Sequence, residues 1–105
     1  MIQIDDAALA LHFKALAHPR RVRIFRLLAE RPEVGRSFQA LQGETRLCDS
    51  SLSHHLWEME RCGVIRRRRR GTFMTFALQT AGLAGSAKAM LRLSETPVIT
   101  SDRAA

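Results

Sequence analysis

The sequence has few cysteines, few acidic residues and no long apolar run. Two cysteines among 105 residues are too few for a disulfide framework. No apolar stretch approaches the ~20 residues that a transmembrane helix needs. The first residues, MIQIDDAALALHFK, place acids before the apolar part, the reverse of a secretory signal. These absences predict a cytoplasmic protein that contacts no membrane.

Charge is the strongest compositional signal. Lysine and arginine number 17 and the acids 10, so the formal net charge is +7. This excess suits a nucleic-acid partner, or less often an anionic membrane surface. We see no nucleophile–base pairing, phosphate-cradling glycine loop or carboxylate cluster, so we expect a binding protein without cofactors and not an enzyme. A chain this short forms one domain at most, and such small cores often gain stability by dimerising.

Apolar periodicity and capping residues predict five helices. Their expected ranges are 4–17, 20–29, 38 to about 43, about 49–62, and 81–93. Strands at 64–69 and 72–78 read as a hairpin around Arg70-Gly71. The predicted fold class is mainly α with a two-stranded β-wing, a winged helix-turn-helix. Residues 1–94 would form the DNA-binding and dimerisation domain, and residues 95–105 a flexible tail.

Two polar clusters lie about twenty residues apart, and both are candidates to touch double-stranded DNA. The helix of residues 49–62 begins with small polar side chains that can enter a major groove. The arginine-rich wing, residues 66–72, would reach the backbone or minor groove. The candidate contacts are Ser50, Ser51, Ser53 and His54 on the helix, and Arg66, Arg67, Arg68, Arg69, Arg70 and Thr72 on the wing.

Each cluster also has a plainer interpretation. The serines and His54 could be ordinary cap and surface residues. The arginine run could be a solvated face, and strand alternation lets only some of the five point toward one surface. If the helix does bind DNA, we expect Ser51 and His54 to meet bases and Ser53 to meet phosphate.

The stretches FKALAHPRRVRIFRLLAE and SLSHHLWEMERCGVIRRRRRGTFMTFAL resemble the ArsR/SmtB winged-helix repressors. The likeness runs from about Leu9 to Leu83. It implies a bacterial homodimer, paired through its first and last helices, that binds operator DNA. Many members of that family release DNA when a metal or metalloid binds.

The chain departs from this family at its metal sites. The resemblance places the family's Cys-x-Cys motif on Ser37-Phe38-Gln39, where neither Ser37 nor Gln39 is a soft ligand. A second family site uses ligands on the last helix, but residues 81–93 contain no His, Asp, Glu or Cys. We therefore expect no metal site of either kind. His12 and His18 flank the end of the first helix, and no spacing argument supports a metal there.

Three other residues of the fourth helix have expectations of their own. His55 shares a face with Leu52 and Met59, which predicts a partly buried structural histidine. Trp57 stands where the family often has a basic residue, and it could pack either on DNA or on the domain itself. Cys62 lies on the apolar face and is expected in the core.

Two other classes of function stay open. The first is a nucleoid or RNA-associated protein that binds nucleic acid without sequence preference. The second is an interaction module that acts on another regulator, its charge being incidental. Binding that is indifferent to sequence would support the first, and failure to bind DNA at low salt would support the second.

Cys48 is a possible redox thiol at the protein–DNA boundary. A helix N-terminus lowers a thiol's pKa, and oxidation to an anionic sulfinate would place charge against phosphate. We predict that peroxide releases the wild-type protein from DNA but leaves Cys48→Ser bound. Binding titrations with and without peroxide test this, and equal responses of the two proteins would eliminate Cys48 as a sensor.

Overall fold

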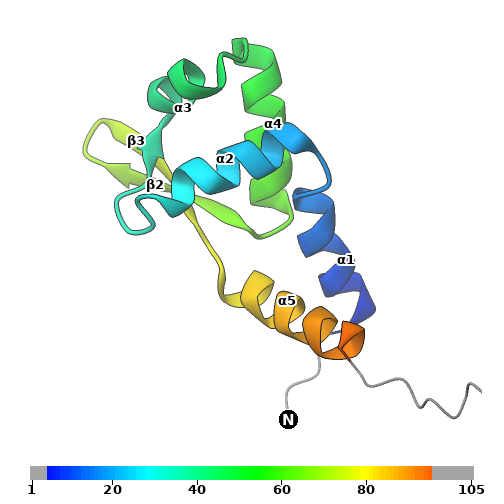
Figure 1. The fold of residues 1–105 in the computed structure, drawn as a ribbon. Coiled ribbons are helices and arrows are strands. Elements are labelled where there is room, and N and C mark those ends of the chain that lie inside the picture. The colour runs from blue at the N-terminus through cyan, green and yellow to red at the C-terminus, as the bar shows by residue number, and fades with distance from the viewer. Residues whose placement is uncertain (1–4, 96–105) are drawn as a thin grey trace, which may run out of the picture.

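A computed structural model describes residues 5–95 and has five helices and three strands among them. The elements follow in the order α1 (Asp6–Ala15), α2 (Pro19–Ala29), β1 (Arg36–Ser37), α3 (Phe38–Thr45), α4 (Asp49–Arg61), β2 (Ile65–Arg70), β3 (Phe73–Leu78) and α5 (Ala81–Ser94). The predicted fold class is confirmed: α3 and α4 form a helix-turn-helix, and β2 and β3 form the wing (Figure 1). Residues 96–105 of the predicted tail lie outside the described residues.

Capping side chains set most of the helix starts. Asp5 accepts a hydrogen bond from the backbone N–H of Ala8 at 2.7 Å, and Ser37 accepts one from Ala40 at 3.0 Å. His18 caps α2 through its Nδ1, which accepts from the backbone N–H of Arg20 at 3.1 Å. Cys48 holds the cap position of α4, but its side chain makes no capping hydrogen bond.

Helix α3 ends later than its glycine suggests. We expected it to stop near Gly43, yet it continues to Thr45. Arg46 closes it in the left-handed conformation, at φ 62°, and its backbone N–H bonds the Gln42 carbonyl. A terminal arginine thus takes the position that glycine usually fills.

The sheet has one strand more than the sequence predicts. Its order is β1-β3-β2, with all pairs antiparallel. Strand β1 is two residues long, too short for an alternating pattern to reveal. Gly35, just before β1, has φ 77°, and a Cβ there would lie 2.4 Å from the Phe76 carbonyl oxygen. The close approach of β1 to β3 therefore requires glycine at position 35.

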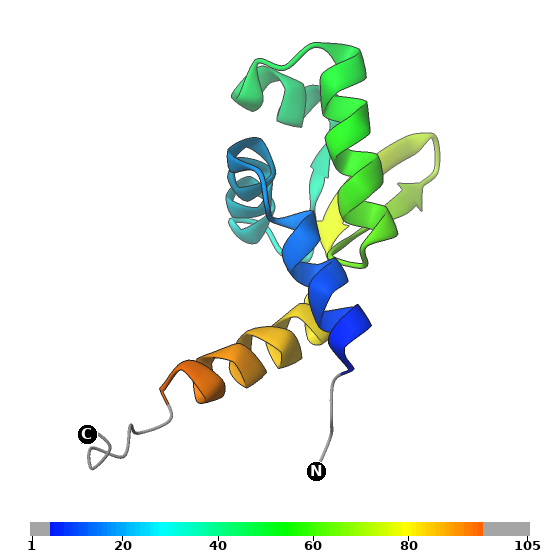
Figure 2. The same cartoon turned by 90° about the vertical axis from the view of Figure 1, so that its right-hand side faces the viewer.

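One continuous core lies between the helices and the sheet. Its fully buried large side chains include those of Ile24, Leu28, Leu41, Leu52, Met59 and Ile65. Helices α1 and α5 lie side by side, away from α3 and the wing (Figures 1 and 2). His12 on α1 shares a 2.6 Å hydrogen bond with the buried Ser86 hydroxyl on α5. Within residues 5–95, no helix combines the length and apolar character needed to span a bilayer.

Two glycine-to-alanine variants should have opposite effects on stability. Gly35→Ala should lower the free energy of unfolding by roughly 2 kcal/mol or more, because it adds left-handed strain and a clash with Phe76. Gly43→Ala meets open space within α3 and should raise it by ~0.5–1 kcal/mol. Chemical denaturation measures both. Equal stability of the two variants would contradict the assigned position of β1.

Candidate nucleic-acid interface

Helix α4 has one buried face and one exposed face. Leu52, His55, Leu56 and Met59 are buried in the core. On the opposite side, a stripe at helical spacing is open to solvent, comprising Ser50, Ser53, His54, Trp57 and Arg61. Of the predicted helix contacts, Ser50, Ser53 and His54 lie on this exposed face. Ser51 is half-buried and less accessible than the other three.

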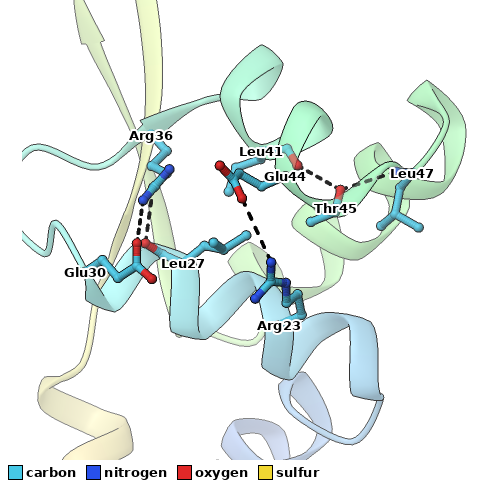
Figure 3. Close-up of polar contacts among 8 residues, drawn as sticks. All are labelled: Arg23, Leu27, Glu30, Arg36, Leu41, Glu44, Thr45 and Leu47. Carbon is cyan, nitrogen blue, oxygen red and sulfur yellow. Dashed lines mark hydrogen bonds and ion pairs between the residues drawn. The ribbon is translucent and has the colours of Figure 1, made fainter.

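The turn between α3 and α4 is held by side chains of α3 (Figure 3). The Thr45 hydroxyl donates to the Leu41 carbonyl at 2.8 Å and accepts from the backbone N–H of Leu47 at 3.3 Å. Gln42 donates hydrogen bonds to the Leu47 carbonyl and to the Asp49 carboxylate. These bonds fix the angle at which α4 leaves α3.

Two ion pairs join α2 to the elements that follow it (Figure 3). Arg36 of β1 pairs with Glu30 at 2.7 Å and donates to the Leu27 carbonyl. Arg23 lies 3.9 Å from Glu44 of α3. The first of these fixes the start of the sheet, and the second helps place α3.

Arg21 links three helices at the buried side of α4. Its Nε donates to Nδ1 of His55 at 3.1 Å, and its terminal nitrogen donates to the Lys14 carbonyl at 3.2 Å. His55 is only 6% exposed and its ring lies 4.7 Å from that of His18. The predicted structural role of His55 is confirmed. Lys14 adds a 3.9 Å pair with Glu58, so α1, α2 and α4 meet at this point.

The hairpin register divides the arginine run into two faces. Arg66, Arg68 and Arg70 lie on one face of β2, and Arg67 and Arg69 on the other. The five side chains therefore cannot all meet one surface.

Two of the five arginines already have partners within the domain. Arg67 donates to Glu60 at 2.9 Å, and its guanidinium lies 6.0 Å from the centroid of the Phe76 ring. Arg68 donates to the Glu33 carbonyl at 2.5 Å. The Arg67 bond ties the wing to the end of α4.

The other three wing arginines are free to contact a partner outside the domain. Arg66, Arg69 and Arg70 are exposed, and no ion pair or side-chain hydrogen bond joins them to another residue of the described chain. Thr72 is exposed in the turn beside them. Of the predicted wing contacts, these four are the accessible ones.

Trp57 is an exposed aromatic on the face that carries His54. Its side chain is 53% exposed, and the Arg61 guanidinium lies 5.4 Å from the ring centroid. Glu58 holds Arg61 in place with contacts of 2.7 and 2.8 Å. The strong hydrogen bond with Arg61 also keeps the pKa of Glu58 below its ordinary value.

The two cysteines occupy different environments, and both are free thiols. Cys62 is buried in the core, as its place on the apolar face predicts. Cys48 is exposed, with its sulfur 3.5 Å from the Ser50 hydroxyl. Hydrogen bonding to Ser50, and then to the backbone of Ser51, lowers the pKa of the Cys48 thiol. Its role as a redox thiol stays a prediction.

Of the two residues in the positions of the family's Cys-x-Cys motif, Ser37 has a structural role and Gln39 is exposed. Ser37 caps α3, and α5 contacts α1 through His12 and Ser86. His18 caps α2. Among residues 5–95, no three His, Cys, Asp or Glu side chains are grouped so that they could hold a metal ion. The arrangement of α3, α4 and the hairpin is that of a winged helix-turn-helix protein.

Comparisons with known proteins agree with this class. No protein-family profile matches the chain. Over 73 residues it is 40% identical to Rv0081 of Mycobacterium tuberculosis, an uncharacterized HTH-type transcriptional regulator. The matched segment covers 69% of this chain and 61% of that protein. The crystal structure of Rv0081 is similar with a TM-score of 0.62 at 37% identity, covering 91% of this chain and 92% of the other.

Two further solved structures share the fold. The ArsR family transcriptional regulator RHA00566 has a TM-score of 0.73 at 24% identity, covering 93% of this chain and all of the other. The homodimeric winged helix-turn-helix DNA-binding domain of Mb0332 from Mycobacterium bovis has a TM-score of 0.65 at 23% identity, covering 93% and 94%. The chain belongs with Rv0081 to the HTH-type transcriptional regulators, and its fold is that of the ArsR-family winged-helix regulators.

The buried histidine should make stability depend on pH. Burial, and then electrostatic interaction with His18 and Arg21, lowers the pKa of His55 below its ordinary value of 6.5. The unfolded chain therefore takes up this proton more readily than the folded protein. We expect the melting temperature to fall as pH drops from 6.5 toward the folded-state pKa of His55.

The control for this prediction is His55→Gln, which keeps a hydrogen-bond acceptor but cannot titrate. Melting temperatures of both proteins between pH 8 and pH 5 give the comparison. The variant should lose less on acidification than the wild type. Parallel curves would show that His55 does not titrate in the folded protein as proposed.

Proposed function

We propose that this protein is a sequence-specific DNA-binding transcriptional regulator that acts in the cytoplasm as a homodimeric repressor. Helix α4 would lie in the major groove, and the wing would contact the backbone or the minor groove. The observation that carries this proposal is a helix-turn-helix whose second helix, α4, exposes a polar face to solvent. It is followed by a wing in which Arg66, Arg69 and Arg70 have no partner among the described residues. Repression itself rests on the family resemblance.

The exposed face of α4 has the right chemistry for base edges. Thirteen helical residues span ~20 Å, and a major groove ~12 Å wide admits a helix. Ser50 and Ser53 are small enough to let the backbone approach the bases. Both serine hydroxyls and the His54 ring can hydrogen-bond to a groove edge. The cation of Arg61, held over Trp57, lies about two turns beyond His54 on the same face.

The wing supplies charge without sequence preference. Arg66, Arg69 and Arg70 would neutralise phosphates and release counterions, which makes affinity fall with salt. Because Arg67 anchors the hairpin to Glu60, these side chains keep a defined position relative to α4.

The apolar surface of α1 and α5 supports the homodimer. Leu91 is 56% exposed and Leu93 is 69% exposed, and Leu11 and Met90 are also open to solvent. Helix α5 contacts mainly α1, so these side chains have no cover within the described domain. A second copy would bury them. The homodimeric state of the Mb0332 domain supports the same arrangement.

The wing prediction is a change in salt dependence. The double variant R69A/R70A should bind every DNA duplex more weakly. Because a homodimer presents two wings, it loses up to four phosphate contacts, and the negative slope of log K against log salt should become shallower by up to about 3.6. Fluorescence anisotropy with a mixed-sequence duplex at several salt concentrations measures this. The control R20A/R26A removes the same charge from exposed positions of α2 and should keep the wild-type slope. An unchanged slope in R69A/R70A would exclude the wing from the interface.

The dimer prediction concerns Leu91. Burying one leucine contributes ~1.5–3 kcal/mol, and symmetry doubles the effect of a substitution. Leu91→Glu should therefore give monomers at micromolar concentration, while the wild type and the control Val22→Glu remain dimers. Sedimentation velocity distinguishes the two. A monomeric wild type would contradict the proposed assembly.

A further inference from the structure

Most of the exposed large apolar side chains belong to surfaces already described, on α1, α4 and α5. Outside those helices there are three such residues within the described chain: Val22, Val34 and Phe73. Val34 is 55% exposed and Phe73 is 67% exposed, and both line the same groove. Neither lies on the proposed DNA-contacting face of α4 or on the dimer helices.

This groove lies between the loop after α2, the start of α3 and the wing. Figure 1 shows that loop beside the hairpin, and the bond from Arg68 to the Glu33 carbonyl joins the two. The groove is open and holds about 320 Å³, near the lower end of small-molecule sites. Val34, Ala40 and Phe73 give it apolar walls.

Two cationic side chains that line the groove, those of Arg31 and Arg70, form no ion pair within the described residues. The other polar side chains that line it are satisfied: Arg36 by Glu30, Ser37 by Ala40, and Thr75 by the Arg68 carbonyl. No acidic residue of the described chain lines this groove, and the adjoining hollow, which Arg31 also lines, has one acid, Glu33.

We propose that this groove binds a small carboxylate with an apolar tail, and that binding weakens the protein's hold on DNA. The tail would pack on Val34 and Phe73, and the carboxylate would accept hydrogen bonds from Arg31 and Arg70. Arginine is suited to this because its planar donors match a carboxylate.

The coupling to DNA follows from the position of two of these residues. Arg70 and Phe73 belong to the wing, on either side of its turn. A carboxylate bound to Arg70 would neutralise its charge and repel a DNA phosphate at the same side chain, so each ligand lowers the affinity of the other. This second half of the inference rests on the proposed function, whereas the groove itself does not.

The site is tested first without DNA, using octanoate as the probe. Titration of the ¹⁵N-labelled protein should shift amide signals in residues 31–40 and 70–75. The neutral analogue octanol should bind at least tenfold more weakly. Signals that move mainly in α1 and α5, or equal affinity for octanol, would overturn the site.

Two pairs of variants sharpen the test. Val34→Ser and Arg31→Ala should each weaken octanoate binding several-fold. The matched controls, Val22→Ser and Arg26→Ala, change similar exposed side chains of α2 outside the groove and should bind as the wild type does. All four positions are solvent-exposed, so thermal melting should confirm intact folds. Equal losses in a variant and its control would overturn the assignment.

The coupling is tested by DNA binding in the presence of octanoate. Octanoate should raise the Kd of the wild type for DNA several-fold, while Arg31→Ala should bind DNA normally and respond little. An equal response of Arg31→Ala would overturn the coupling. If the protein bound octanoate in the groove but no DNA under any condition, the site would stand and both the coupling and the proposed function would fail.

Discussion

The structure depends on how α4 is held. Leu52, Leu56 and Met59 bury one face of this helix, and the bond from Arg21 to His55 adds a directional contact at the same face. Apolar burial alone resists sliding and rotation poorly, because it has no preferred direction. The Arg21 bond, together with the hydrogen bonds of Thr45 and Gln42 at the preceding turn, fixes the rotation of α4. That rotation determines which side chains of α4 are exposed to solvent.

The limited supply of acids divides the arginines into two groups. Glu30, Glu58 and Glu60 each hold one arginine that fixes an element: β1, the end of α4 and the wing. Such exposed pairs contribute little stability individually. Their consequence is one of position, because the arginines of the wing tip are left without acids. A domain with net charge +7 therefore concentrates unpaired positive charge where a polyanion can reach it.

Much of the fold could be predicted from the sequence, since helix periodicity and caps such as Ser37 act locally. The burial of His55 and Cys62 followed from the same periodicity. Strand β1 could not be predicted, because two residues carry no alternation and its pairing depends on the distant Phe76. The sequence also could not predict which of the five arginines have partners within the domain, because five identical residues do not indicate which one contacts Glu60 or the Glu33 carbonyl.

The contact between Arg21 and His55 joins residues 34 positions apart, and no local pattern marks it. The groove of Val34 and Phe73 likewise forms only when the loop and the wing meet.

Selection of DNA duplexes from a random pool by the purified protein tests most directly whether the exposed face of α4 reads DNA sequence. The wild type should enrich a near-palindrome with half-sites about one helical turn apart, and His54→Ala should lose preference at a symmetric pair of positions. A pool that stays random would contradict sequence-specific recognition and support binding that is indifferent to sequence.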